Sequence, residues 1–174
     1  MAYRSTDIVS RAQWGARETK ESDHMGTPVK IVFIHHTAGQ HSTTQEEGGR
    51  ISRGIQNFHM DDRQWADIGY NFLVDEGGHV YEARGWDRVG AHTKGWNAMS
   101  VAFSVMGNFE ETKPDVRALE AVQGMIQLGI DKGKISKDYK LYGHRDVGQT
   151  ACPGENLYKI VRTWENYSEE KPKK

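Results

Sequence analysis

The sequence has a single cysteine, few prolines and no long apolar run, and these shortages exclude several classes of protein. With Cys152 as the only cysteine among 174 residues, no intramolecular disulfide can form, so the fold must depend on its core, with or without a metal. No apolar run approaches the roughly 18 residues of a transmembrane helix, and the mean hydropathy is -0.76. Residues 1–7 also lack the apolar core of a secretory signal, so either the chain is not routed that way or a signal has been removed.

The charge balance argues against two classes of partner. The formal net charge is -1 and the pI is about 6.7, whereas nucleic acids and anionic membranes favour a concentrated basic surface. We therefore expect no nucleic-acid partner and no membrane insertion. The sequence also gives no sign of an obligate protein partner. The length fits one domain over residues 1–174, with a core of about 8–166. The tail at 167–174 is highly charged and is expected to fray.

The apolar pattern predicts an α/β domain with a central mixed sheet flanked by helices. Buried or alternating apolar runs predict the strands, and an apolar residue at every third or fourth position predicts the helices. Thr43 and Thr44 before Gln45-Glu-Glu47 offer helix-capping chemistry, and Asp75-Glu-Gly-Gly78 is typical of a hairpin turn. The expected strands cover 30–34, 70–74, 79–83, 100–106 and 141–142, and the expected helices cover 44–60, 114–132 and 155–164.

Metal-ligating side chains gather in the segment Gly143-His-Arg-Asp-Val-Gly-Gln-Thr-Ala-Cys-Pro-Gly154. His144 and Cys152 offer imidazole and thiolate, and the pair His35-His36 adds another imidazole after the apolar run Ile31-Val-Phe-Ile34. Zinc takes these ligands in tetrahedral geometry, and three protein ligands leave an open position, as in catalytic sites. A free cysteine is more often a small buried hydrophobe, but the turn-forming Pro153-Gly154 makes the ligand interpretation the better one.

Six motifs, in order, make the chain resemble a known family. They are Ile34-His-His-Thr-Ala-Gly39, Ile55-Gln-Asn-Phe-His-Met60, Asp67-Ile-Gly-Tyr-Asn-Phe72, Tyr81-Glu-Ala-Arg-Gly-Trp86, Gly90-Ala-His92 and Gly143-His-Arg-Asp146. From residue 11 to residue 164 the chain resembles the peptidoglycan recognition proteins, the animal branch of the zinc-dependent N-acetylmuramoyl-L-alanine amidases. The resemblance implies that family's fold, with a zinc site at the end of a groove. It also implies hydrolysis of the bond between N-acetylmuramic acid and the L-alanine of the peptidoglycan stem peptide.

The same resemblance assigns roles at the centre of the site. It implies Zn²⁺ bound by His35, His144 and Cys152, with Tyr70 as the catalytic tyrosine and Thr150 in support. No His-Glu-x-x-His segment is present to supply a glutamate base, so orientation of water and stabilisation of the developing oxyanion can fall to Tyr70 and Thr150. Judged by composition alone, Tyr70 would be an ordinary strand residue.

Groove contacts are likewise implied by the resemblance. They correspond to His36, His59, Arg63, Trp65, Arg84, His92 and Asn97. Tryptophan and arginine at positions 65 and 84 accompany a preference for meso-diaminopimelate stems, whose extra carboxylate an arginine can meet. Gln64 replaces the glycine usual before that tryptophan. Taken singly, His59 is also consistent with a helix-end cation, Trp65 with core, and Arg63 and Arg84 with solvated surface.

Two alternatives to the amidase stay open. One is a peptidoglycan-binding receptor of innate immune sensing with slow or no catalysis, and the other is a purely structural zinc or a metal-free fold. The family's usual pair of cysteines would fall near Ser42 and Gly48, and neither is cysteine here. Their absence allows a bacterial, phage or intracellular member, or an animal lineage that stabilises this helix differently. The substrate implies that the protein acts outside the cell or in a host compartment facing the bacterial wall.

Overall fold

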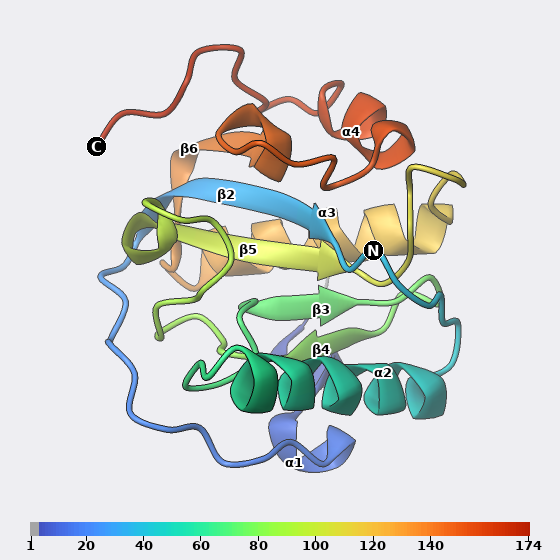
Figure 1. Cartoon of the computed structure of the whole chain (residues 1–174). Coiled ribbons are helices and arrows are strands. Elements are labelled where there is room, and N and C mark those ends of the chain that lie inside the picture. Colours follow the sequence, from blue (N-terminus) through green and yellow to red (C-terminus); the bar gives the residue numbers. More distant parts are fainter. Residues whose placement is uncertain (1–3) are drawn as a thin grey trace.

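A computed structural model describes residues 4–174 (Figure 1), so the first three residues of the expected domain lie outside the described residues. A six-stranded sheet forms the centre, in the order β1-β4-β3-β5-β2-β6. β3 and β4 pair antiparallel as the predicted hairpin, and the other neighbours are parallel. The mixed sheet is therefore confirmed. The strands are β1 (Ile8–Val9), β2 (Val29–His36), β3 (Phe72–Val74), β4 (Val80–Glu82), β5 (Ser100–Val105) and β6 (Ile135–Gly143).

Helices cover both faces of the sheet. In Figure 1, α2 lies in front of the sheet on the β4 side, and α3 lies behind the sheet. The apolar face of α3 packs on alternate residues of the central strands, among them Val32, Ile34 and Phe103. No helix within residues 4–174 is long and apolar enough to cross a membrane. The α-helices are α1 (Arg11–Trp14), α2 (Gln45–Asn57), α3 (Val116–Asp131) and α4 (Glu155–Val161).

Capping residues set the starts of the two long helices. The Thr44 side chain accepts the Glu47 N–H at 3.2 Å at the start of α2, and Asp115 accepts the Arg117 N–H at 2.8 Å at the start of α3. A side-chain oxygen at this position satisfies one of the backbone donors that a helix start leaves free. After α2 the chain continues in a π-helical turn, Phe58–Asp62, which carries His59.

Two strands extend beyond their predicted bounds. β2 continues through His35 and His36, so both histidines belong to the strand. β6 begins at Ile135, although residues 137, 138 and 140 are polar and exposed. An edge strand needs no apolar side chains where it is not covered, so the apolar pattern marked only its buried end. The short α1 and β1 were not predicted, because four and two residues show no periodicity.

The C-terminal tail runs back along β6. The Ser168 N–H donates to the Leu141 carbonyl at 3.2 Å, and the Tyr142 hydroxyl donates to the Glu170 carbonyl at 2.7 Å. The Lys174 ammonium lies 5.3 Å from the centre of the Trp96 ring. These contacts hold the charged tail against the rest of the domain.

Candidate metal centre and groove

Parallel pairing brings two of the predicted ligands to one edge of the sheet. Ile34 of β2 is paired with Gly143 of β6, and His35 and His144 follow them directly. The carboxyl ends of parallel strands meet at the same edge, which is where open α/β sheets place their ligands. On β2, His35 shares a face with Ile31 and Phe33, since side chains alternate along a strand. That face is opposite to the one covered by α3.

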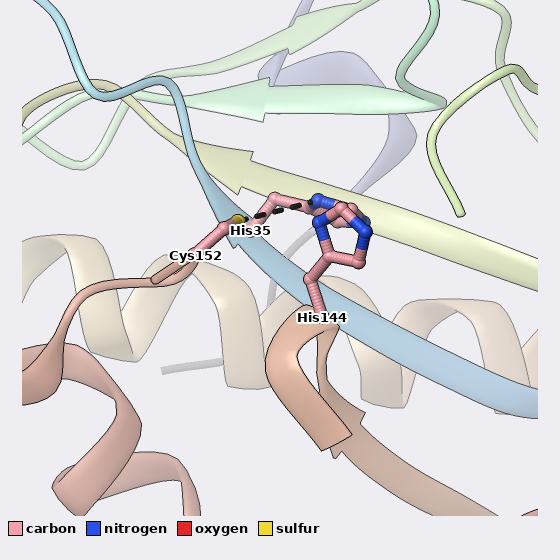
Figure 2. A group of neighbouring side chains, drawn as sticks. All are labelled: His35, His144 and Cys152. Atoms are coloured by element: carbon pink, nitrogen blue, oxygen red, sulfur yellow. Dashed lines mark hydrogen bonds between the residues drawn. The ribbon is translucent and has the colours of Figure 1, made fainter. Parts of the chain in front are cut away.

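The third predicted ligand, Cys152, is brought to this edge by a loop that hydrogen bonds hold in place. The Arg145 N–H donates to the Cys152 carbonyl at 2.9 Å, and the Cys152 N–H donates to the Thr150 hydroxyl at 3.1 Å. The Cys152 sulfur then lies 3.5 Å from His35 Nδ1 and accepts the His36 N–H at 3.4 Å. Figure 2 shows the two imidazoles and the thiol converging from β2, the turn after β6 and the loop.

These three side chains fit a tetrahedral metal ion. One ligand atom from each lies within 4.8 Å of the others. Zinc bonds of about 2.0 Å to nitrogen and 2.3 Å to sulfur, at a tetrahedral angle, separate the two ligand atoms by roughly 3.5 Å. The His35 Nδ1 to Cys152 Sγ separation has that length without any side-chain movement. With three protein ligands, a fourth position would face the groove.

Burial sets the protonation of these groups. It lowers the pKa of His35 well below its usual value, and the neighbouring His92 and His144 lower it further. Burial likewise lowers the pKa of His144, so both imidazoles are neutral near pH 7 and each can offer a lone pair. Burial raises the pKa of the Cys152 thiol to about 12. A bound cation inverts that preference, because a coordinating thiol is deprotonated.

A cavity of about 420 Å³ opens beside the three ligands. A larger one of about 550 Å³, near the C-terminal tail, has no histidine or cysteine in its lining. All the predicted site residues except Arg84 and Asn97 line the smaller cavity. Three alanines that sequence reasoning missed also line it, because a methyl group carries no chemical signal. The lining comprises His35, His36, Ala38, His59, Arg63, Trp65, Tyr70, Ala91, His92, His144, Thr150, Ala151 and Cys152.

Tyr70 and two histidines face the cavity in defined states. The Tyr70 ring centre lies 5.5 Å from that of His35, and burial raises the Tyr70 pKa to about 12. His59 Nδ1 accepts the Gly69 N–H at 2.9 Å, and His36 Nδ1 accepts the Phe109 N–H at 3.2 Å. Burial lowers the pKa of each of these histidines to about 4. Both are therefore neutral, with the proton on Nε2.

Trp65 and Arg63 form an aromatic and cationic wall of the cavity beside His59. The Trp65 and His59 rings have centres 4.7 Å apart, and the Arg63 guanidinium lies 5.4 Å from the centre of the Trp65 ring. Gln64, between them, has a left-handed backbone with φ of 61°, which glycine adopts at no steric cost. The glycine expected at this position thus has a conformational reason, and the chain tolerates glutamine there instead.

Arg84 and Asn97 support the groove from behind. Arg84 is 8% exposed, and its guanidinium donates to the carbonyls of Ile68 at 2.7 Å, Val89 at 2.8 Å and Asp67 at 3.3 Å. The Asn97 carboxamide oxygen accepts the N–H groups of His92 and Thr93 at 2.9 and 2.8 Å. Neither side chain lines the cavity, so each has a structural function that sequence reasoning did not anticipate.

Fold and site together define an α/β domain with a two-histidine, one-cysteine group at the carboxyl edge of its sheet. The sequence pattern of the N-acetylmuramoyl-L-alanine amidase family matches residues 25–155. Peptidoglycan recognition protein 1 of Bos indicus is 42% identical over 161 residues, covering 92% of this chain and 85% of that protein. Peptidoglycan-recognition protein SC1a of Drosophila melanogaster is 38% identical over 161 residues, covering 92% and 87%. The chain belongs to this amidase family and to its peptidoglycan recognition protein branch, as the motifs predicted.

Solved structures agree with this assignment. The complex of tracheal cytotoxin with the ectodomains of peptidoglycan recognition proteins LCa and LCx matches with a TM-score of 0.92 and 45% identity, covering 94% of this chain and 99% of that chain. Human peptidoglycan recognition protein Iβ C, in complex with glycosamyl muramyl pentapeptide, matches with a TM-score of 0.90 and 40% identity, covering 94% and 99%. The predicted fold is therefore confirmed.

Proposed function

We propose that the protein is a zinc-dependent N-acetylmuramoyl-L-alanine amidase that binds peptidoglycan and hydrolyses the bond between N-acetylmuramic acid and L-alanine of the stem peptide. The observation that carries this proposal is the convergence of His35, His144 and Cys152 at the end of a cavity that Tyr70 and Thr150 also line. The matching amidase family pattern and the relatives complexed with peptidoglycan fragments support the substrate class.

His35, His144 and Cys152 would hold the zinc, as the 3.5 Å nitrogen to sulfur separation supports. Zinc held at such a three-ligand site would supply a Lewis acid that polarises a carbonyl and lowers the pKa of a bound water towards about 7. The His36 N–H that points at the Cys152 sulfur stabilises the thiolate form. This donor is part of β2 and is therefore already in place before any ligand binds.

Tyr70 is suited to stabilise negative charge that develops on the scissile carbonyl oxygen. With its pKa raised to about 12, the phenol remains protonated at neutral pH and can donate a hydrogen bond. A donor fixed in a partly desolvated cavity stabilises the transition state more strongly than one in water. Thr150 shapes the Cys152 loop through its contact with the Cys152 N–H and presents its exposed side chain to the cavity.

His36, His59, Arg63, Trp65 and His92 would orient glycan and stem along the groove, with Arg84 and Asn97 behind them. The Nε2–H groups of His36 and His59 are donors for carbonyl and hydroxyl oxygens. Arg63 over the Trp65 ring places a cation at the wall, and a stem with a meso-diaminopimelate carboxylate would meet it. The relative peptidoglycan recognition protein LE, solved with monomeric diaminopimelic acid-type peptidoglycan, supports this stem preference.

Mass spectrometry of a diaminopimelate-type muropeptide incubated with the zinc-loaded protein tests the proposal. We expect release of the intact stem peptide with a free L-alanine amine, no release by Cys152→Ser, and a loss of about 10²-fold or more in rate for Tyr70→Phe. Tyr139→Phe, which removes a phenol outside the cavity, is the matched control and should retain the wild-type rate. A lysine-type muropeptide tested in parallel measures the stem preference.

The second candidate is a non-catalytic recognition protein of innate immune sensing. It is favoured by the relatives, which are named recognition proteins. Intact muropeptide after incubation, together with saturable binding by calorimetry, would reject the amidase and support the receptor. Either function would be exercised where bacterial cell wall is exposed, outside the cell or in a compartment that faces it.

A further inference from the structure

Thr93 connects a metal-ligating histidine with a groove histidine. Its hydroxyl lies 3.1 Å from His35 Nε2 and 2.8 Å from His92 Nδ1, and the residue is 1% exposed. A hydroxyl has one proton to donate and lone pairs to accept. Between two ring nitrogens it therefore donates to one and accepts from the other, so the tautomers of the two histidines are coupled.

Only one of the two arrangements is compatible with a metal on His35. If His35 Nδ1 offers its lone pair beside Cys152, the proton is on Nε2 and is donated to the Thr93 oxygen. Thr93 then donates to His92 Nδ1, and the His92 proton is on Nε2. The reverse arrangement would place a proton on His35 Nδ1, the nitrogen 3.5 Å from the Cys152 sulfur, where the metal would bind.

The far end of this chain of hydrogen bonds faces the substrate cavity. His92 lines the cavity, and its Nε2 is buried without a hydrogen-bond partner among residues 4–174. A buried donor without a partner costs about 1–3 kcal/mol unless something bonds to it. An acceptor on a bound ligand is the partner available to this nitrogen.

Asn97 fixes the position of Thr93 itself. Its carboxamide oxygen accepts the backbone N–H groups of both His92 and Thr93. Two donors on one oxygen orient the backbone that carries the hydroxyl, and metal sites commonly depend on such supporting hydrogen bonds. This gives Asn97 a function at the metal site although it does not line the cavity.

We propose that Thr93 is a positioning residue that holds His35 in its metal-binding tautomer and, by the same hydroxyl, holds His92 with its proton on Nε2 towards the substrate. This inference rests on the proposed function, because it assumes that His35 binds zinc through Nδ1.

Zinc affinity and histidine tautomers test the proposal without any turnover. Zinc dissociation constants are measured by competition with a chelating dye for the wild type, Thr93→Val and Thr93→Ser. Loss of a supporting hydrogen bond to a ligating histidine weakens metal binding by about 10–100-fold, and we expect this for Thr93→Val. Thr93→Ser keeps the hydroxyl and should remain within about threefold of the wild type. Ser52→Ala, which removes a buried hydroxyl bonded to the Gly48 carbonyl in α2, is the matched control and should leave the affinity unchanged.

Nitrogen-15 NMR of the histidine rings gives the second readout. Its wild-type measurement does not depend on whether Thr93→Val folds. In the zinc-loaded wild type, His92 should have its proton on Nε2, and in a folded Thr93→Val it should populate both tautomers. Wild-type zinc affinity in folded Thr93→Val, or a His92 proton on Nδ1 in the loaded wild type, would overturn this inference alone. A wild type that binds no zinc would overturn the proposed function and this inference with it.

Discussion

Acid should destabilise this protein partly through His59, and the effect can be calculated. The side chain is 8% exposed, and its Nδ1 accepts the Gly69 N–H. Burial, aided by Arg63 and Arg84, lowers its pKa from 6.5 to about 4. The folded state thus resists a proton that the unfolded state takes up readily. Stability from this source is fully present above pH 6.5 and is lost as the pH falls towards 4.

The size of the loss follows from the two pKa values. At pH 5 the unfolded histidine is almost fully protonated and the folded one is about one tenth protonated. The difference in proton binding, integrated from pH 7.5 to pH 5, corresponds to about 2 kcal/mol of unfolding free energy. In His59→Gln this contribution should be absent, because glutamine does not titrate, and its amide oxygen can accept the Gly69 N–H.

Urea unfolding at pH 7.5 and pH 5.0 in the presence of a chelator measures the effect. His35, His36 and His92 also have lowered pKa values and contribute to the acid sensitivity of both proteins, so the comparison between them isolates His59. The wild type should lose about 2 kcal/mol more than His59→Gln between the two pH values. Equal losses would show that His59 is not neutral in the folded protein at pH 5.

Three further changes test the packing around the groove by urea unfolding at pH 7.5. Gln64→Gly should raise the unfolding free energy by about 0.5 kcal/mol, since the left-handed backbone costs other residues about 1–2 kcal/mol. Gln64→Val should lower the unfolding free energy, and the reverse order of the two variants would show that the backbone at residue 64 is not strained. Gly48→Ala should lower the unfolding free energy by about 1–3 kcal/mol, because a Cβ there would overlap the Tyr81 hydroxyl. An unchanged unfolding free energy would mean that the Tyr81 ring moves aside at no cost. Arg84→Lys should lower the unfolding free energy by about 2 kcal/mol, because it leaves backbone carbonyls without a donor. An unchanged unfolding free energy would show that the guanidinium does not bind these carbonyls.

Gly48 also explains why the family's cysteine pair can be absent here. The Tyr81 hydroxyl, which fills the space beside Gly48, donates to the buried Asp75 at 2.6 Å. Ser42 donates to the Thr44 carbonyl at 2.9 Å at the start of α2. Side-chain hydrogen bonds and a packed ring therefore occupy the region near Ser42 and Gly48, where the resemblance predicts the family's cysteine pair, and they hold this end of α2 without a covalent link.

The sheet and its long helices could be predicted because their residues repeat at the spacing of the element. Ile34, Phe72 and Phe103 lie in apolar runs, and α3 presents an apolar residue every third or fourth position. The polar half of β6 could not be found this way, since residues 137 and 138 are exposed in an edge strand. Its parallel pairing with β2 depends on contacts between segments about a hundred residues apart, which no local pattern records.

The limits of prediction at the site have the same cause. His35, His144 and Cys152 are recognisable because each carries ligand chemistry and stands beside a strand end or in a turn. Arg84 looks like a groove cation in the sequence, but its guanidinium is buried among backbone carbonyls. Thr93 has no chemistry that marks it, and it meets His35 across 58 residues of sequence. A hydroxyl between two imidazoles becomes significant only through its geometry, because accepting a hydrogen bond from one ring leaves its own proton to be donated to the other ring. In the inference proposed above, a residue that no sequence signal marks would thus determine which nitrogen of His35 faces a bound metal.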